Sequence, residues 1–104
     1  MDDFKRAMYV DALQAIERRR SRCVCAALIA AYEMAMGASL IAEATDWQQL
    51  YTLTKAEFPE FFRLYDGYKW SNGQCEETPQ NGFWWTLYDY APRIRILKYI
   101  LATH

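Results

Sequence analysis

The sequence has 104 residues, of which 53% are hydrophobic and 24% are charged, and its formal net charge at pH 7 is -1. This length fits one domain with one modest core, and the hydrophobic content excludes a disordered chain. A net charge so close to zero argues against a nucleic-acid-binding protein that acts through its overall charge. We therefore expect a single globular domain over residues 1–104.

The cysteines and the first residues bear on location. The chain contains three cysteines, an odd number that is typical of reduced thiols in the cytosol. Its first residues are acidic, whereas a secretory leader begins with positive charge. We therefore expect a cytoplasmic protein.

The most apolar stretch, residues 23–42, is as long as the roughly 20 residues that a membrane-spanning helix needs. Glu33, however, would stand near the bilayer centre at a cost of about 2.5–3.5 kcal/mol, and Gly37 stands where a soluble helix ends. We therefore expect no membrane span but a buried helix over residues 22–36, with Ser21 as its cap. Because this helix is apolar on every face, it should lie in the middle of a bundle.

Other helices follow from capping residues and spacing. Asp2 or Asp3 can cap a first helix, which we expect to end near Arg20. The capping-box pattern at 46–49 predicts a third helix through about residue 57, followed by a short helix over 60–65. Pro92 suits the first turn of a last helix.

Residues 66–82 differ from the rest of the chain because they contain three turn-forming dipeptides. These are Asp66-Gly67, Asn72-Gly73 and Asn81-Gly82. The sequence as a whole therefore predicts an all-α fold, a compact bundle of four to five helices, with a Trp-rich irregular loop or short hairpin at about 66–85.

Residues for catalysis or metal binding do not form a pattern. Cys23 and Cys25 would lie ~200° apart on a helix, too far around it to hold one ion, and the one histidine is His104. No nucleophile with a nearby base and no phosphate-binding loop is visible, and spacing singles out no pair of carboxylates. We expect neither a metal nor a cofactor, no catalytic residue and no enzyme activity.

Glu33 is a candidate buried polar site, because a buried carboxylate must be paired or stay protonated. One interpretation places it at the edge of its helix or beside an arginine. The other places it in a pocket or at a subunit interface.

Two basic groups are candidate polar contacts. Four arginines form the strongest local charge feature: Arg18, Arg19, Arg20 and Arg22. They either contact phosphates or lie in solvent at a helix end, where the dipole favours positive charge. Arg93 and Lys98 belong to a second group, in the last helix.

Aromatic residues make up 16% of the chain, and Trp70, Trp84, Trp85 and Tyr88 lie close together in it. Tryptophan and tyrosine dominate protein interfaces, and they also stack on nucleotides. They either close the core as a lid, form a protein interface or line a small-ligand pocket.

Four segments carry a resemblance to a known group of proteins: 23–28 (CVCAAL), 58–62 (FPEFF), 82–85 (GFWW) and 93–100 (RIRILKYI). With the N-terminal amphipathic helix, they resemble small all-α proteins encoded by phages and other mobile elements. The resemblance implies an accessory protein that binds and modulates a host protein, including as an inhibitor of a bacterial defence system.

We therefore expect a small non-catalytic interaction protein that docks on another protein or forms a homodimer. The expected partner-binding residues are Trp70, Trp84, Trp85, Tyr88, Arg93 and Lys98. One alternative is a protein that binds or sequesters a nucleotide, and a second is a protein that contacts nucleic acid through residues 18–22.

Overall fold

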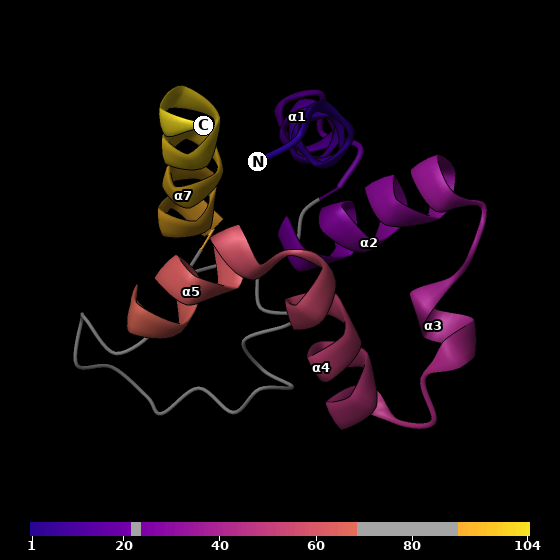
Figure 1. Cartoon of the computed structure of the whole chain (residues 1–104). Helices are drawn as coiled ribbons and strands as arrows, with labels where there is room; N and C mark the ends of the chain where they lie inside the picture. Colours follow the sequence, from indigo (N-terminus) through magenta and orange to yellow (C-terminus); the bar gives the residue numbers. More distant parts are fainter. Residues whose placement is uncertain (22–23, 69–89) are drawn as a thin grey trace.

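The structure, a computed structural model, describes residues 1–21, 24–68 and 90–104, and within them it contains helices and no strand (Figure 1). The helices are α1 (Asp3–Glu17), α2 (Val24–Met36), α3 (Leu40–Glu43), α4 (Trp47–Glu57), α5 (Pro59–Tyr68) and α7 (Tyr90–Thr103). The predicted all-α fold is thus confirmed. The part of the predicted loop or hairpin from residue 69 onward lies outside the described residues.

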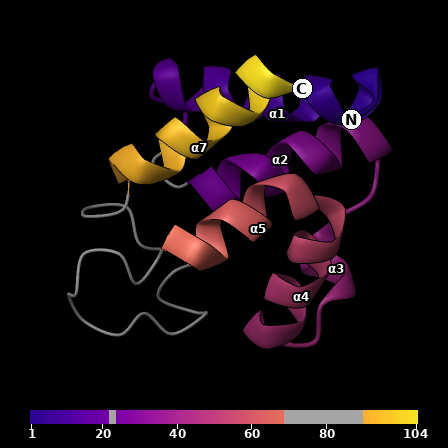
Figure 2. The ribbon, with the colours of Figure 1, turned by 60° about the vertical axis from the view of Figure 1, so that its left-hand side comes forward.

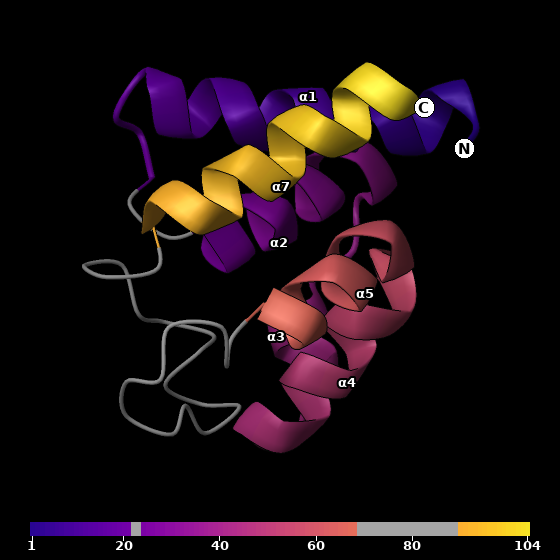
Figure 3. The ribbon, with the colours of Figure 1, turned by 90° about the vertical axis from the view of Figure 1, so that its left-hand side faces the viewer.

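The helices form two groups. α1 and α2 run in roughly opposite directions, and α7 lies beside α1 with its C-terminal end near the start of α1 (Figure 3). A hydrogen bond from Arg6 Nη1 to the Leu101 carbonyl oxygen, 2.9 Å long, joins these two helix ends. The second group consists of α3, α4 and α5, of which α5 also packs against α7 (Figure 2).

α1 begins where the sequence predicts and ends earlier. Asp2 is its cap, accepting a 2.7 Å hydrogen bond from the backbone N–H of Lys5. The predicted end near Arg20 is wrong, because Arg19 turns into the left-handed region at φ +57. The N–H groups of Arg19 and Arg20 then bond back to the carbonyls two and three residues before the C-cap, which closes the helix at Glu17 in a Schellman motif.

α2 ends at Met36, and Gly37 follows in the left-handed conformation at φ +66, as the sequence predicts. The first turns of α2 are buried, but its last residues are exposed, so only part of this apolar helix lies inside the bundle. The short helix α3 was not predicted. Its signal is Ser39, whose hydroxyl accepts a hydrogen bond from Ala42 N–H at 3.2 Å.

α4 has the predicted cap and the predicted end. Asp46 accepts a 2.8 Å hydrogen bond from Gln49 N–H, while the Gln49 side chain accepts from Thr45 N–H at 2.6 Å. α5 starts at Pro59, whose missing N–H costs nothing in the first helical position.

α5 continues to Tyr68, so the predicted turn at Asp66-Gly67 and the predicted end at residue 65 are wrong. One glycine costs a helix only about 1 kcal/mol. Burying one phenylalanine side chain contributes about 1.5–3 kcal/mol, and α5 buries two of them, Phe61 and Phe62.

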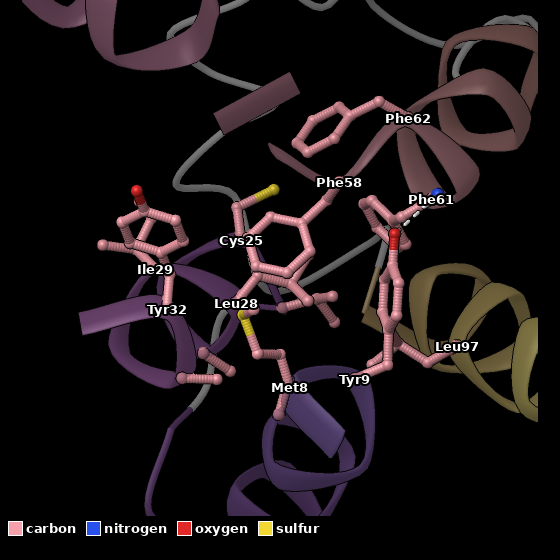
Figure 4. Packing of buried hydrophobic residues seen from close by; sticks show 14 of the residues in the cluster. Met8, Tyr9, Cys25, Leu28, Ile29, Tyr32, Phe58, Phe61, Phe62 and Leu97 are labelled. Atoms are coloured by element: carbon pink, nitrogen blue, oxygen red, sulfur yellow. Dashed lines mark hydrogen bonds between the residues drawn. The ribbon is translucent and has the colours of Figure 1, made fainter. Parts of the chain in front are cut away.

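The core lies where α1, α2, α5 and α7 meet (Figure 4). Its largest side chains are aromatic and fully buried, and they pack edge to face. Tyr9 and Phe58 have ring centroids 5.3 Å apart, and Phe61 and Phe62 have centroids 5.1 Å apart. The aromatic rings within the described core thus come from α1 and from the α4–α5 corner as well as from α2.

Candidate interaction surfaces

Polar side chains on α1 join this helix to the corner between α4 and α5. Lys5 Nζ donates to the Glu57 carbonyl oxygen, lies 3.7 Å from Glu57 Oε2, and stands 5.1 Å from the centroid of the Phe58 ring. The ammonium group therefore has a carbonyl, a carboxylate and an aromatic face as partners. These contacts hold α1 against the end of α4.

Tyr9 makes the second polar link from α1, to the start of α5. Its side chain is fully buried, and its hydroxyl donates to Glu60 Oε1 at 2.8 Å. The Tyr9 hydroxyl oxygen also accepts a hydrogen bond from Phe61 N–H at 3.2 Å. Burial, and then the hydrogen bond and charge of Glu60, raise the pKa of Tyr9 well above its usual range. The phenol therefore stays neutral and serves as a structural bridge.

Several carboxylates that acid–base catalysis would need are engaged in structural contacts. Asp2 and Asp46 cap helices, Glu57 pairs with Lys5, and Glu60 accepts from Tyr9. Among the described residues, no group of three or more His, Cys, Asp and Glu side chains could hold a metal ion. Cys25, the cysteine that the structure describes, is buried.

Glu33, the candidate polar site on α2, is half-buried near the C-terminal end of that helix. Its Oε1 accepts a 3.0 Å hydrogen bond from the Ser39 hydroxyl, just before α3. A carboxylate at this end of a helix is disfavoured by the dipole, and the serine hydroxyl offsets part of that cost. The structure thus gives Glu33 a role in joining α2 to α3.

A group of exposed apolar side chains lies at the end of α2 and in α3. Met34 is 84% exposed, Ile41 54% and Met36 49%. We call these three residues the α2–α3 surface; within it, Met34 and Met36 lie ~200° apart around α2 and so project from different sides of its last turn. No motif in the sequence distinguishes these residues, although an α2 that is apolar on every face carries more apolar residues than one packed face needs.

The arginines of the first basic group lie at the end of α1. Arg18, Arg19 and Arg20 are all exposed, and Arg22 lies outside the described residues. In α7, Arg95 and Lys98 are exposed. Arg93 belongs to the first turns of α7, but the structure does not describe its side chain.

The aromatic candidates fall in a part of the chain that the structure does not describe. Trp70, Trp84, Trp85 and Tyr88 all lie between residues 69 and 89. Their assignment as partner-binding residues stays a prediction.

Comparison with models of known protein families, with curated proteins and with solved structures finds no match to this chain. Over the residues that the structure describes, every helix is too short or too polar to cross a membrane.

Proposed function

We propose that the protein is a small non-catalytic interaction protein that works by binding another protein molecule. The observation that carries this proposal is the α2–α3 surface, and above all Met34, which is 84% exposed. Removing apolar area from water is favourable by about 25 cal/mol per Å², so a partner that covers these side chains gains affinity. Methionine side chains are flexible and adapt to the shape of a partner.

The polar contacts at the α4–α5 corner support the non-catalytic part of the proposal. Glu57 and Glu60 are two carboxylates close together in the chain, and each is bound to a side chain of α1. A general acid or base must be free to reach a substrate proton. These groups instead hold helices together.

The aromatic segment is the second part of the proposed binding surface. We assign Trp84 and Trp85 as anchors, with Trp70 and Tyr88 beside them, because tryptophan and tyrosine supply much of the binding energy of protein interfaces. Arg93 and Lys98 would then add polar contacts at the rim. The resemblance to mobile-element proteins favours a host protein as the partner, and modulation of that host protein as the result.

One experiment tests the α2–α3 surface against a matched control. Met34→Glu/Ile41→Glu adds two negative charges to the surface, and Gln14→Glu/Gln48→Glu adds two at exposed positions of α1 and α4. Light scattering after size-exclusion chromatography measures self-association, and affinity capture from a host lysate, followed by a binding assay with the purified captured protein, measures a foreign partner. We expect the first variant to lose the partner and the second to keep it.

The outcomes are distinct. If both variants bind as the unchanged protein does, or if the unchanged protein is a monomer without a partner, the proposed role of this surface is wrong. Thermal unfolding of both variants shows whether the fold is intact. Trp84→Ala and Trp85→Ala, measured in the same assays, test the aromatic segment separately and should weaken binding without loss of cooperative unfolding.

A further inference from the structure

The two ends of α1 carry opposite charge. The helix is preceded by Asp2 and begins with Asp3, both exposed, and it is followed by the exposed side chains of Arg18, Arg19 and Arg20. A helix of 15 residues is about 22 Å long. This separation exceeds the distance of roughly 10 Å over which charges act at moderate salt. The overall charge of -1 therefore does not describe the arginine end.

The first half of α7 carries a fourth exposed arginine. α7 runs opposite to α1, with Leu101 bound to Arg6 near the start of α1, so the first half of α7 extends toward the arginine end (Figure 3). Arg95 is exposed in that half. α2 also begins at this end (Figure 3), and the positive ends of the α2 and α7 dipoles add to the charge of the arginines.

The arginines at the end of α1 differ from the other cations of that helix. Lys5 and Arg6 each donate to a carbonyl oxygen on another helix. No hydrogen bond or ion pair connects the side chains of Arg18–Arg20 to any other residue that the structure describes. Their guanidinium groups thus present their charge and their donors to solvent.

We infer that this end of the bundle, formed by Arg18, Arg19 and Arg20 at the end of α1, binds the phosphate backbone of a nucleic acid. Three consecutive Cα atoms span at most about 8 Å, and one strand of duplex DNA carries a phosphate every ~3.4 Å along the axis. A polyanion with such a charge density can meet several of these closely spaced charges at once, whereas a protein would need a run of carboxylates to match it. One guanidinium group can also donate two parallel hydrogen bonds to the oxygens of one phosphate.

This inference is independent of the α2–α3 surface, and its test uses a different assay. Fluorescence anisotropy measures binding of the full-length protein to short labelled DNA, single-stranded and duplex, over a series of salt concentrations. Arg18→Gln/Arg20→Gln removes two charges and leaves the left-handed Arg19 in place. Lys55→Gln/Arg63→Gln removes two charges from exposed positions of α4 and α5 and is the matched control.

We expect the Arg18→Gln/Arg20→Gln variant to bind DNA about tenfold more weakly at low salt. Its slope of log affinity against log salt on duplex DNA should be smaller by about 1.8, because each lost phosphate contact removes about 0.9 from the slope. The Lys55→Gln/Arg63→Gln variant should keep both values.

Three results would overturn the inference. The first is that the unchanged protein does not bind DNA at low salt. The second is that both double variants lose the same affinity, which would mean that net charge alone is responsible. The third is that the arginine variant binds phosphatidylserine-containing vesicles or an acidic peptide more weakly than the control does, while the two variants bind DNA equally well. Circular dichroism and thermal unfolding of each variant confirm that the fold is retained.

Discussion

The hydroxyl of Tyr9 caps a helix to which it does not belong, because it accepts the backbone N–H of Phe61 at 3.2 Å. Phe61 is the third residue of α5, a position whose N–H is usually satisfied by a serine or aspartate side chain just before the helix. Phe58 stands there instead, with no side-chain acceptor. Tyr9 supplies the oxygen from α1, and it also donates to Glu60 at 2.8 Å.

Removing this hydroxyl should destabilise the protein. Tyr9→Phe leaves the buried Phe61 N–H without its acceptor and Glu60 without its donor, which should lower the free energy of unfolding by about 1–3 kcal/mol. Urea unfolding followed by circular dichroism measures the change. Tyr99→Phe is the control, because Tyr99 is 58% exposed, and surface changes usually stay within about 0.5 kcal/mol. Equal effects of the two changes would contradict the capping role.

Stability should fall in alkaline solution. The pKa of Tyr9 is raised in the folded protein from its ordinary value of 10.0, because the side chain is buried and faces Glu60. The folded state thus holds this proton more tightly than the unfolded state does. The stabilisation is complete below pH 10 and decreases above it, by no more than about 1.4 kcal/mol per pH unit.

The same unfolding measurements at pH 8 to about 12 check this prediction, since the pKa of free tyrosine is about 10. The free energy of unfolding of Tyr9→Phe should decline less steeply above pH 10, because the phenylalanine has no proton to lose. Parallel curves for the two proteins would show that Tyr9 does not cause the decline.

Glycine at position 19 should stabilise the protein. Arg19 has φ +57 in the turn that closes α1, and this conformation costs a residue with a Cβ atom about 1 kcal/mol or more. Arg19→Gly removes both the side-chain charge and this conformational cost. Arg19→Ala removes the same charge but keeps the conformational cost. Thermal and urea unfolding should show the glycine variant more stable than the alanine variant by about 0.5–1 kcal/mol. A more stable alanine variant would exclude the left-handed turn.

Truncating two apolar residues of α2 should change stability by very different amounts. Leu28 is fully buried, so Leu28→Ala should cost about 2–5 kcal/mol of unfolding free energy. Met34 is 84% exposed, and Met34→Ala should stay within about 0.5 kcal/mol. Urea unfolding of both variants makes the comparison, and a large cost for Met34→Ala would mean that this side chain packs within the fold.

The helices of this protein could be read from the sequence where their signals are local. Asp2, Gly37, Asp46 and Pro59 each act on backbone groups within a few residues, so their effect does not depend on the rest of the fold. The end of α1 differs from the prediction because no residue there signals the turn that closes the helix. Arg19 has no intrinsic preference for the left-handed conformation that it adopts there.

The candidate surfaces depended on tertiary structure to different degrees. The arginine run is visible in the sequence, and its distance from the acidic start of α1 follows from the length of that helix. That the first half of α7 extends toward the arginine end follows from how α1 and α7 pack. The exposure of Met34 could not be predicted, because an apolar side chain gives no local sign of whether a neighbouring helix covers it.

The sequence by itself thus determined the fold class, the helix limits that local caps set and the charge run, since capping and periodicity act over three or four residues. Only the tertiary structure decided which apolar residues stay in solvent and that Tyr9 binds Glu60, 51 positions away. The physical reason is that burial and long-range hydrogen bonds depend on how all the helices pack together, and no local segment contains that information.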